Sequence, residues 1–260
     1  MNNLLYICFN RFDLVQKTLP PLLELDWDNI VILCDGSRNE TDQLAIDEIK
    51  YFINERFASC NLNLVYRMTN MGCRRNIEDG LNFFFREFGV GWVFEDDVLL
   101  TKPECFKEIR SAQLFGHVSL YNHLPCLNYN RIPVSNGQYF IWGWYLNVDR
   151  PIDFKLVPSF SLLVKLVRIR GFNRGTRLFV TFVRTLLNKV DTWDSIYRCW
   201  AIYNDVNNSV VGLSVVQNIG FDERATHTST AVVVPFAVKE YQSIEDWNRE
   251  ASKRNPTYLA

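Results

Sequence analysis

Short apolar runs alternate with longer amphipathic stretches over the first hundred residues. The apolar runs cover residues 4–9, 29–34, 62–66 and 90–94. Each run is too short for a helix but has the length and composition of a strand buried on both faces. Between the runs, apolar residues recur every three or four positions, which is the period of an amphipathic helix. This alternation predicts right-handed crossovers and an α/β fold with a mostly parallel central sheet flanked by helices.

The pattern changes after Pro103, where the regular alternation stops. The two parts of the chain, residues 1–102 and 103–260, are therefore expected to be differently organised halves fused into a single domain. The elements expected in the second half are helices over 104–115 and 193–203, an irregular aromatic-rich strand over 137–148, and a strand over 210–218.

Composition and charge exclude several classes of protein. The net charge of −1 argues against a general nucleic-acid binder, which usually carries a strong basic excess. The seven cysteines are scattered and form no C-x-x-C pair, which favours free thiols in a reducing compartment over a disulfide framework or a zinc site. No apolar run approaches the roughly 18 residues of a membrane span, and no basic leader precedes the first strand. We therefore expect a cytoplasmic location.

Carboxylates follow two of the predicted strands at the point where each strand ends. Glu95, Asp96 and Asp97 come directly after the fourth apolar run, and Asp35-Gly36 follows the second. In parallel sheets, ligands bind beyond the carboxyl ends of the strands. Adjacent carboxylates repel one another and need a cation or full solvation, and Mg²⁺ or Mn²⁺ prefers such oxygen ligands. A solvated acidic turn is the alternative, but the position beside Asp35 favours a metal site.

Several short motifs occur along the chain in a fixed order. They are Phe9-Asn10-Arg11, Cys34-Asp35-Gly36-Ser37, Asn70 to Asn76, Glu95-Asp96-Asp97, Trp142-Gly143-Trp144, Trp193-Asp194, Gln217 to Phe221 and Ala225 to Thr228. Each motif is weak alone, but together they make the chain resemble the inverting GT-A-type glycosyltransferases over roughly residues 5 to 230. The pattern is most similar to N-acetylglucosaminyltransferase I-like enzymes and to small bacterial nucleotide-diphospho-sugar transferases.

The resemblance implies a Rossmann-like GT-A fold with a nucleotide-sugar-binding half (1–102) and an acceptor-binding, catalytic half (103–260). Asp97 would ligate Mn²⁺ or Mg²⁺, Asp96 would contact the ribose, and Asp35 would read the base, with UDP as the preferred nucleotide. The other implied nucleotide contacts are Asn10, Arg11, Gly36 and Arg75. The implied contacts to the sugar or acceptor are Glu95, Trp142, Trp144 and Trp193.

Two further residues are candidates for chemistry. An inverting transferase needs a carboxylate that takes the proton of the acceptor hydroxyl, and Asp194 is the predicted base. The alternative role for Asp194 is a helix cap, and Asp191 is its nearest competitor as the base. His227 is a candidate metal ligand because Mn²⁺ also accepts imidazole, although a lone histidine is more often structural.

Residues 154–190 contain eight Lys or Arg and no acidic residue. Basic amphipathic helices of this kind lie on anionic membrane surfaces, which would suit a transferase with a lipid-linked acceptor at the inner face of the membrane. The alternative is a pair of solvated helices that pack through their apolar faces.

Two rival functions use similar folds. A sugar nucleotidyltransferase usually opens with a glycine-rich phosphate loop after the first strand, whereas residues 10–13 here contain no glycine. A catalytically inactive nucleotide- or glycan-binding protein is the second rival, because a fold does not settle a function.

Overall fold

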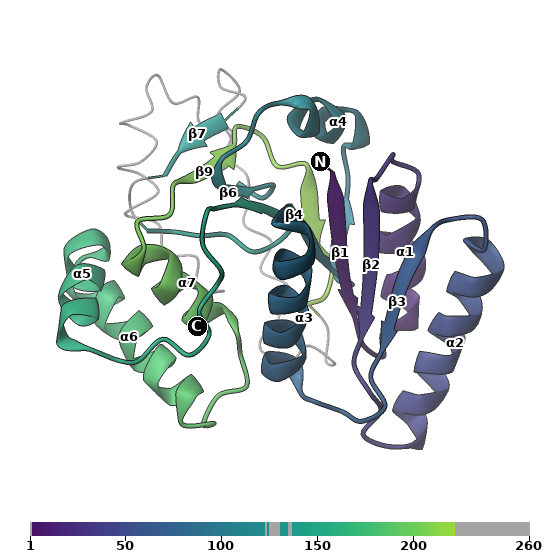
Figure 1. Ribbon diagram of the computed structural model, residues 1–260, viewed down its shortest axis with the longest axis horizontal. Coiled ribbons are helices and arrows are strands. Elements are labelled where there is room, and N and C mark those ends of the chain that lie inside the picture. The colour runs from purple at the N-terminus through teal and green to yellow at the C-terminus, as the bar shows by residue number, and fades with distance from the viewer. Residues whose placement is uncertain (1, 123, 125–130, 135–136, 222–260) are drawn as a thin grey trace.

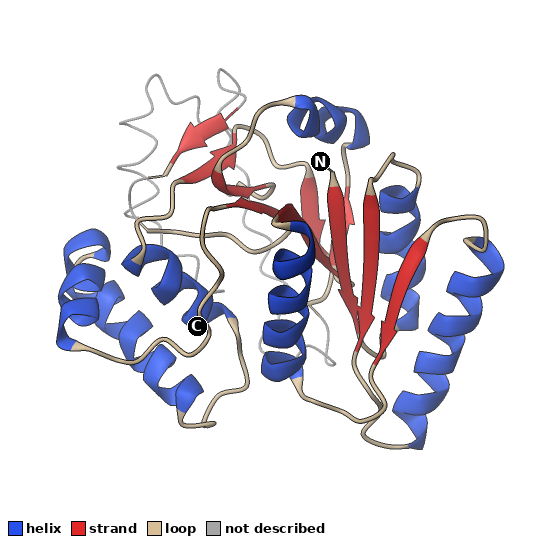
Figure 2. Cartoon of the chain, in the orientation of Figure 1, coloured by secondary structure: helices blue, strands red, loops and turns tan. Residues whose placement is uncertain are grey.

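The computed structural model describes residues 2–122, 124, 131–134 and 137–221. An eight-stranded sheet in the order β3-β2-β1-β4-β8-β6-β9-β7 runs through the molecule, with helices on both faces (Figures 1 and 2). The predicted α/β class with a mostly parallel central sheet flanked by helices is confirmed. Within the described part of the chain, no helix combines the length and the apolar character that a membrane crossing needs.

The first half of the chain is a regular series of parallel strands and crossover helices. Strands β1, β2, β3 and β4 are parallel neighbours, and the register pairs Cys8 with Cys34, Cys34 with Tyr66 and Ile7 with Glu95. This register brings the carboxyl ends of the four strands to one edge. The elements are β1 (Asn3–Cys8), α1 (Phe12–Leu23), β2 (Asn29–Cys34), α2 (Glu40–Arg56), β3 (Leu62–Tyr66), α3 (Cys73–Phe88) and β4 (Val90–Glu95).

The second half completes the sheet with antiparallel and parallel pairs. Strand β8 is antiparallel to both β4 and β6, β9 is parallel to β6, and β7 is antiparallel to β9. The continuous sheet joins both halves, and their functional division stays a prediction. The elements are β5 (Val98–Leu100), α4 (Pro103–Ser111), β6 (Gly116–Ser119), β7 (Arg131–Pro133), β8 (Trp144–Asn147), α5 (Phe160–Arg170), α6 (Phe172–Leu186), α7 (Asp194–Tyr203), β9 (Asn208–Val211) and β10 (Val216–Asn218).

One expected strand is two strands in the structure. The apolar run over 210–218 is divided between β9, which joins the main sheet, and β10, which pairs antiparallel with β5. Strand β5 begins immediately after the acidic trio, so this pairing carries the segment that follows β10 onto the trio. A continuous apolar run does not reveal such a change of partner.

Both faces of strand β1 are buried, as its apolar run predicts. Along β1, Leu4 and Tyr6 pack into the core beneath α1 and α2, and Leu5 and Ile7 pack into the core beneath α3 and α7. All four side chains are at most 5% exposed. The alternation follows from the two-residue period of a strand.

A neutral polar network lies inside the second core. The His117 ring contacts the Tyr197 hydroxyl at 2.7 Å through Nδ1, and contacts Ser119 Oγ at 2.8 Å and the Phe140 carbonyl at 3.0 Å through Nε2. Burial lowers the pKa of His117 to about 3. The imidazole is therefore neutral at physiological pH, and its hydrogen bonds offset the cost of burying a polar ring.

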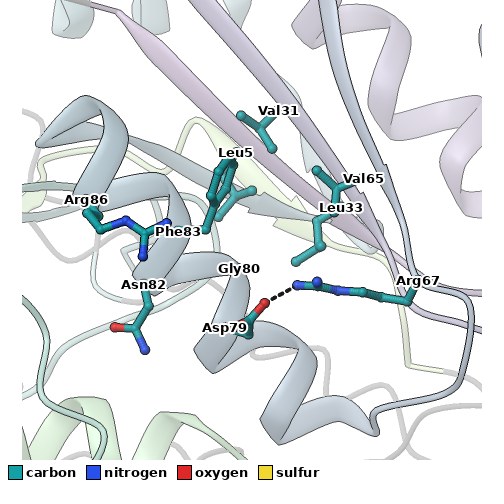
Figure 3. A pocket seen from close by; sticks show the side chains of 10 residues that line it. All are labelled: Leu5, Val31, Leu33, Val65, Arg67, Asp79, Gly80, Asn82, Phe83 and Arg86. Carbon is teal, nitrogen blue, oxygen red and sulfur yellow. Dashed lines mark hydrogen bonds and ion pairs between the residues drawn. The ribbon is translucent and has the colours of Figure 1, made fainter.

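A cavity of about 330 Å³ lies between α3 and the face of β1, β2 and β3 (Figure 3). Its floor is apolar, and an ion pair between Arg67 and Asp79 crosses one end. At Gly80 a β-carbon would meet the Leu33 side chain at 2.2 Å, so glycine lets α3 lie close to the sheet here. The cavity is separate from the edge where the strands end, because the carboxylates of that edge do not line it.

Candidate active site

The rim formed by the carboxyl ends of β1, β2 and β4 collects most of the predicted site residues. Asn10 and Arg11 follow β1, Asp35 follows β2, and the acidic trio ends β4. Parallel register places these ends side by side although the residues of different strand ends are 24 to 87 positions apart in sequence.

Arg11 bridges two of the three carboxylates. Its Nη2 donates to Asp96 Oδ1 and lies 3.1 Å from Asp97 Oδ2. Burial alone lowers the pKa of Arg11, yet the two carboxylates raise it above its usual range, so the guanidinium stays charged. A single cation thus balances an adjacent pair of acids.

Asp96 is held more tightly than Asp97. Its second carboxylate oxygen accepts from the Phe9 backbone N–H at 3.3 Å, and its backbone carbonyl accepts from the Thr18 hydroxyl at 3.0 Å. Burial raises the pKa of Asp96 to about 6 although Arg11 opposes the shift. The Asp97 side chain keeps 20% of its surface exposed, against 5% for Asp96. Asp97 is therefore the carboxylate that a ligand reaches first, and the ribose contact of Asp96 stays a prediction.

Asp35 organises the loop that precedes α3. Its carboxylate accepts from the backbone N–H groups of Gly36 at 2.8 Å, Met71 at 2.9 Å and Gly72 at 3.1 Å, and from the Asn70 amide at 3.1 Å. Burial raises its pKa and these N–H groups oppose the rise. A Cβ at Gly36 would meet the Thr69 backbone at 2.3 Å, so Gly36 is needed for this close contact. The base contact predicted for Asp35 and Gly36 stays a prediction beside this structural role.

Asn10 is positioned by a residue that the sequence did not single out. Its amide donates to Asp42 Oδ1 at 2.5 Å, and Arg38 contacts the same carboxylate through Nε at 2.7 Å. The Arg38 hydrogen bond, more than any other contact, lowers the pKa of Asp42 to about 2. Arg38 also lies over the Phe9 ring at 4.9 Å. No local pattern signals the contact between Asn10 and Asp42, which are separated by a whole helix.

Tertiary structure brings Asp194 into range of the acidic trio. Burial raises the pKa of Glu95 well above its ordinary value, and the charges of Asp97, Asp96 and Asp194 raise it further. Burial is the main cause of the raised pKa of the Cys73 thiol, and the charges of Glu95 and Asp194 raise this pKa further. The predicted base and the predicted metal-binding segment therefore lie near one another.

Asp194 is the first residue of α7 and is not its N-cap, which is Trp193. Its carboxylate accepts from the Thr192 hydroxyl and forms an ion pair of 2.9 Å with Arg198, whose side chain is only 3% exposed. Sequence reasoning missed Arg198, although its position four residues after Asp194 on a predicted helix favours such a pair.

Asp191 has a different role from Asp194. Its two carboxylate oxygens accept from the backbone N–H groups of Cys73 at 3.1 Å and Arg74 at 3.0 Å. Asp191 thus caps the first turn of α3, where free N–H groups and the helix dipole favour a negative charge. Arg75, in the same turn, is exposed and its charge acts on Glu78. Its diphosphate contact stays a prediction.

The three predicted aromatic contacts separate into two groups. Trp144 is 0% exposed and Trp193 is 3% exposed, and their rings stack at 6.0 Å inside the second core. This placement gives both a packing role, because neither ring offers a face to a sugar. Trp142 is half-buried and packs against Tyr121 and Phe221 at 4.6 and 5.6 Å. Of the three tryptophans we retain Trp142 as a sugar-contact candidate, and the sugar or acceptor contact of Glu95 stays a prediction.

The segment that follows β10 packs against the acidic trio. Ile219 N–H donates to the Asp97 carbonyl at 2.8 Å. A β-carbon at Gly220 would meet Asp97 at 2.5 Å and Arg11 Nη1 at 2.8 Å, so only glycine fits here without displacing them. His227 lies outside the described residues.

The donor set suits a metal that binds together with its substrate. Within the described ranges, no group of three His, Cys, Asp or Glu side chains could hold a metal ion. Asp97 nevertheless offers a partly exposed carboxylate at a strand end. Mg²⁺ and Mn²⁺ are commonly held by one or two carboxylates plus phosphates and water. These residues therefore fit a metal that arrives with a diphosphate.

No protein-family model matches the chain, and no curated protein matches it in sequence. Similar solved structures include the mannosyltransferase PcManGT from Pyrobaculum calidifontis in complex with GDP-Man and Mn²⁺ (11% identity, TM-score 0.46, 87% of this chain and 59% of that chain). They also include S. aureus TarS 1-349 (12%, 0.46, 83% and 59%) and a UDP-glucose pyrophosphorylase complexed with UDP-glucose (10%, 0.37, 97% and 98%). The chain thus spans about three fifths of the length of the first two. Likeness at this level carries no inference about activity, so function is argued from the site.

Proposed function

We propose that the chain is a metal-assisted GT-A-type glycosyltransferase. It would move a sugar from a nucleotide-diphosphate sugar, preferably UDP-linked, to a glycan or lipid-linked glycan. One observation carries the proposal: Arg11 bridges Asp96 and Asp97 at the carboxyl end of a parallel sheet, with Asp194 in electrostatic range of the same strand end. That edge is where parallel α/β sheets bind ligands.

The rim residues divide into groups that bind the donor and groups that respond to its charge. Asp97 would hold Mn²⁺ or Mg²⁺, which when bound neutralises charge that develops on the departing diphosphate. After the metal ion, the guanidinium of Arg11 would be the second positive charge near the diphosphate, because it lies 3.1 Å from the Asp97 carboxylate. Once Asp97 has another cation as its partner, the guanidinium is available to a phosphate oxygen, which it binds well through its planar fork of donors. Asn10, Asp35 and Asp96 would complete the nucleotide contacts.

Asp194 would act as the general base of an inverting transfer. As the acceptor hydroxyl attacks the anomeric carbon opposite the leaving diphosphate, its proton passes to a carboxylate. Arg198 and Thr192 fix the orientation of the Asp194 carboxylate. Asp191 is less suited to the role because both its oxygens are engaged by α3.

The first test is thermal unfolding of the full chain with UDP, GDP, CDP or dTDP, each with and without Mn²⁺. A nucleotide at about 100 times its Kd stabilises the folded state by roughly 2.7 kcal/mol. We expect UDP with Mn²⁺ to give this shift and Asp97→Asn to abolish it. The matched control is Asp149→Asn, which removes an exposed carboxylate outside the rim. If no nucleotide raises the melting temperature with or without metal, the proposal is wrong.

Product analysis separates the transferase from its rivals. A transferase releases a nucleoside diphosphate from the sugar donor, whereas a nucleotidyltransferase consumes a nucleoside triphosphate and releases pyrophosphate. A non-catalytic binding protein gives the thermal shift with neither product. The anomeric configuration of the glycoside formed decides between inversion and retention.

A further inference from the structure

The strongest unassigned feature of the molecule is the hairpin of α5 and α6, which lies at the far end from β3 (Figure 1). The two helices are joined at Gly171 and cross closely where Gly175 packs on the Leu166 backbone. Their inward residues, among them Leu162 and Phe182, are 0% exposed and belong to the second core. The inward face of the hairpin is therefore fully explained by packing.

The outward face carries apolar residues that packing does not explain. Phe160 is 80% exposed and Val164 is 49% exposed on α5, and Phe172 is 73% exposed at the start of α6. Val180 and Leu187 follow on the outer side of α6 at 49% and 60%. Single exposed apolar residues are ordinary on protein surfaces, but five on one helical hairpin form a set that marks an interaction surface.

Exposed cations lie on the hairpin and directly beside it, with Lys155 before α5 and Lys189 after α6. None of the five exposed cations of this segment forms an ion pair with a carboxylate among the described residues; they are Lys155, Arg168, Arg177, Arg184 and Lys189. The remaining three cations are engaged within the molecule. Lys165 pairs with Asp205 at 2.6 Å, Arg170 donates to the Gly137 carbonyl at 3.2 Å, and Arg174 is half-buried with a partner of its own. The exposed charges are therefore free for an external partner.

Basic and apolar residues alternate along single stripes. Along α6 and its C-cap Leu187, the residues Arg177, Val180, Arg184 and Leu187 recur at the spacing of one helical face. This arrangement fits the boundary of an anionic bilayer, where apolar side chains enter the acyl region and arginines meet the lipid phosphates. A nucleic acid would leave the exposed aliphatic residues in water, and the whole chain has a net charge of only −1.

We propose that the outward face of the α5–α6 hairpin docks on an anionic lipid surface. The chain passes from the end of α6 through a short loop to Asp191 and Asp194, and Thr185 on α6 contacts Ser195 at 3.0 Å. Docking would hold the proposed base near the bilayer. That part of the inference rests on the proposed function and identifies the acceptor class as a lipid-linked glycan, whereas the docking itself stands on the hairpin alone.

The test is cosedimentation of the full chain with phosphatidylcholine vesicles that contain either no phosphatidylglycerol or about 30% of it. We expect binding to the anionic vesicles alone and its loss in about 0.5 M salt, which screens exposed charges. Arg177→Glu/Arg184→Glu and Phe160→Ser/Phe172→Ser should each weaken vesicle binding at least tenfold. If the wild type does not bind anionic vesicles, or binds neutral vesicles equally well, docking is wrong.

Matched controls alter equally exposed residues elsewhere on the chain. Arg86→Glu/Lys107→Glu reverses two cations on α3 and α4, and Leu44→Ser/Tyr51→Ser removes two exposed apolar residues on α2. These variants should bind vesicles like the wild type, and an equal loss in them contradicts the proposal.

The UDP–Mn²⁺ thermal shift is measured on every variant. In the hairpin variants the nucleotide shift should persist while vesicle binding is lost. In the wild type, a nucleotide shift without binding to anionic vesicles refutes docking and leaves the proposed transferase intact. Vesicle binding without any nucleotide shift supports docking and refutes the transferase.

Discussion

The buried polar groups at the rim of the parallel strands are charged, whereas the buried histidine in the other half of the central sheet is neutral. At the carboxyl ends of β1, β2 and β4, ionised groups meet in pairs: Arg11 with Asp96 and Asp97, and Arg38 with Asp42. Beneath β6 and β8, His117 is a neutral ring held by hydrogen bonds, and burial lowers its pKa to about 3. Paired charges thus lie at the rim, whereas the buried imidazole of His117 is kept neutral.

This difference separates the residues of the proposed site from residues that specify how the core packs. A buried ion pair is a poor source of stability, because desolvation offsets its attraction. A cluster of carboxylates at a sheet edge is therefore more informative about binding than about folding. A neutral hydrogen-bonded network, in contrast, mainly specifies how the core packs. Asp194 belongs to α7 in the second half of the chain, yet its charge acts on Glu95 at the rim. Substitution of Asp194 is therefore the strictest test of this comparison.

The largest effect is expected from Asp194→Asn. Removal of a general base lowers the rate by about 10² to 10⁴, while nucleotide binding should persist because Asp194 does not contact the rim residues that would hold the donor. The measurements are kcat with the sugar donor and the UDP–Mn²⁺ thermal shift.

Asp191→Asn is the matched control for Asp194→Asn. It should weaken the cap of α3 and cost about 1 kcal/mol of stability, with kcat changed only a few-fold. If Asp191→Asn lowers kcat more than Asp194→Asn does, the assignment of the base is reversed.

A smaller effect, on stability alone, is expected from His117→Gln. The folded pKa of about 3 lies below the value of about 6.5 for an unfolded histidine. Between these values the unfolded state binds the extra proton, so the wild type should lose stability as the pH falls, by up to about 1.4 kcal/mol per pH unit. The amide of Gln does not titrate, so the variant should lack this slope. Urea unfolding at several pH values provides the measurement, and parallel curves for the two proteins would contradict the neutral network.

The smallest effect is expected from Asp42→Asn. Hydrogen bonds to Arg38 and Asn10 lower the pKa of Asp42 to about 2, below its unfolded value of about 3.9. Its contribution is therefore complete above about pH 4 and lost as the pH falls toward 2. At neutral pH the variant should lose about 1 kcal/mol, because Arg38 is largely exposed. The two proteins should approach equal stability near pH 2 in chemical unfolding, and a difference that persists there would contradict the charged role of Asp42.

The parallel half of the fold was largely readable from the sequence. Strand β2 (Asn29–Cys34) has the predicted bounds, because a run buried on both faces must be apolar throughout. Helix α3 begins at Cys73, where Gly72 (φ +81°) turns the chain and Asp191 caps the first turn. Helix α1 contains Pro20 and Pro21 in its last turn and ends at Leu23.

The sequence by itself determined the α/β class, the position of the acidic trio at a strand end and the basic character of residues 154–190, because each depends on period and local composition. Only the tertiary structure decided that Arg11 bridges Asp96 and Asp97, that Gly220 packs against them and that Asp194 comes within electrostatic range of Glu95. It also decided that Trp144 and Trp193 are core residues and Trp142 is not. These outcomes depend on strand pairing and helix packing between distant segments, and an apolar pattern specifies that a residue is buried without specifying its partner.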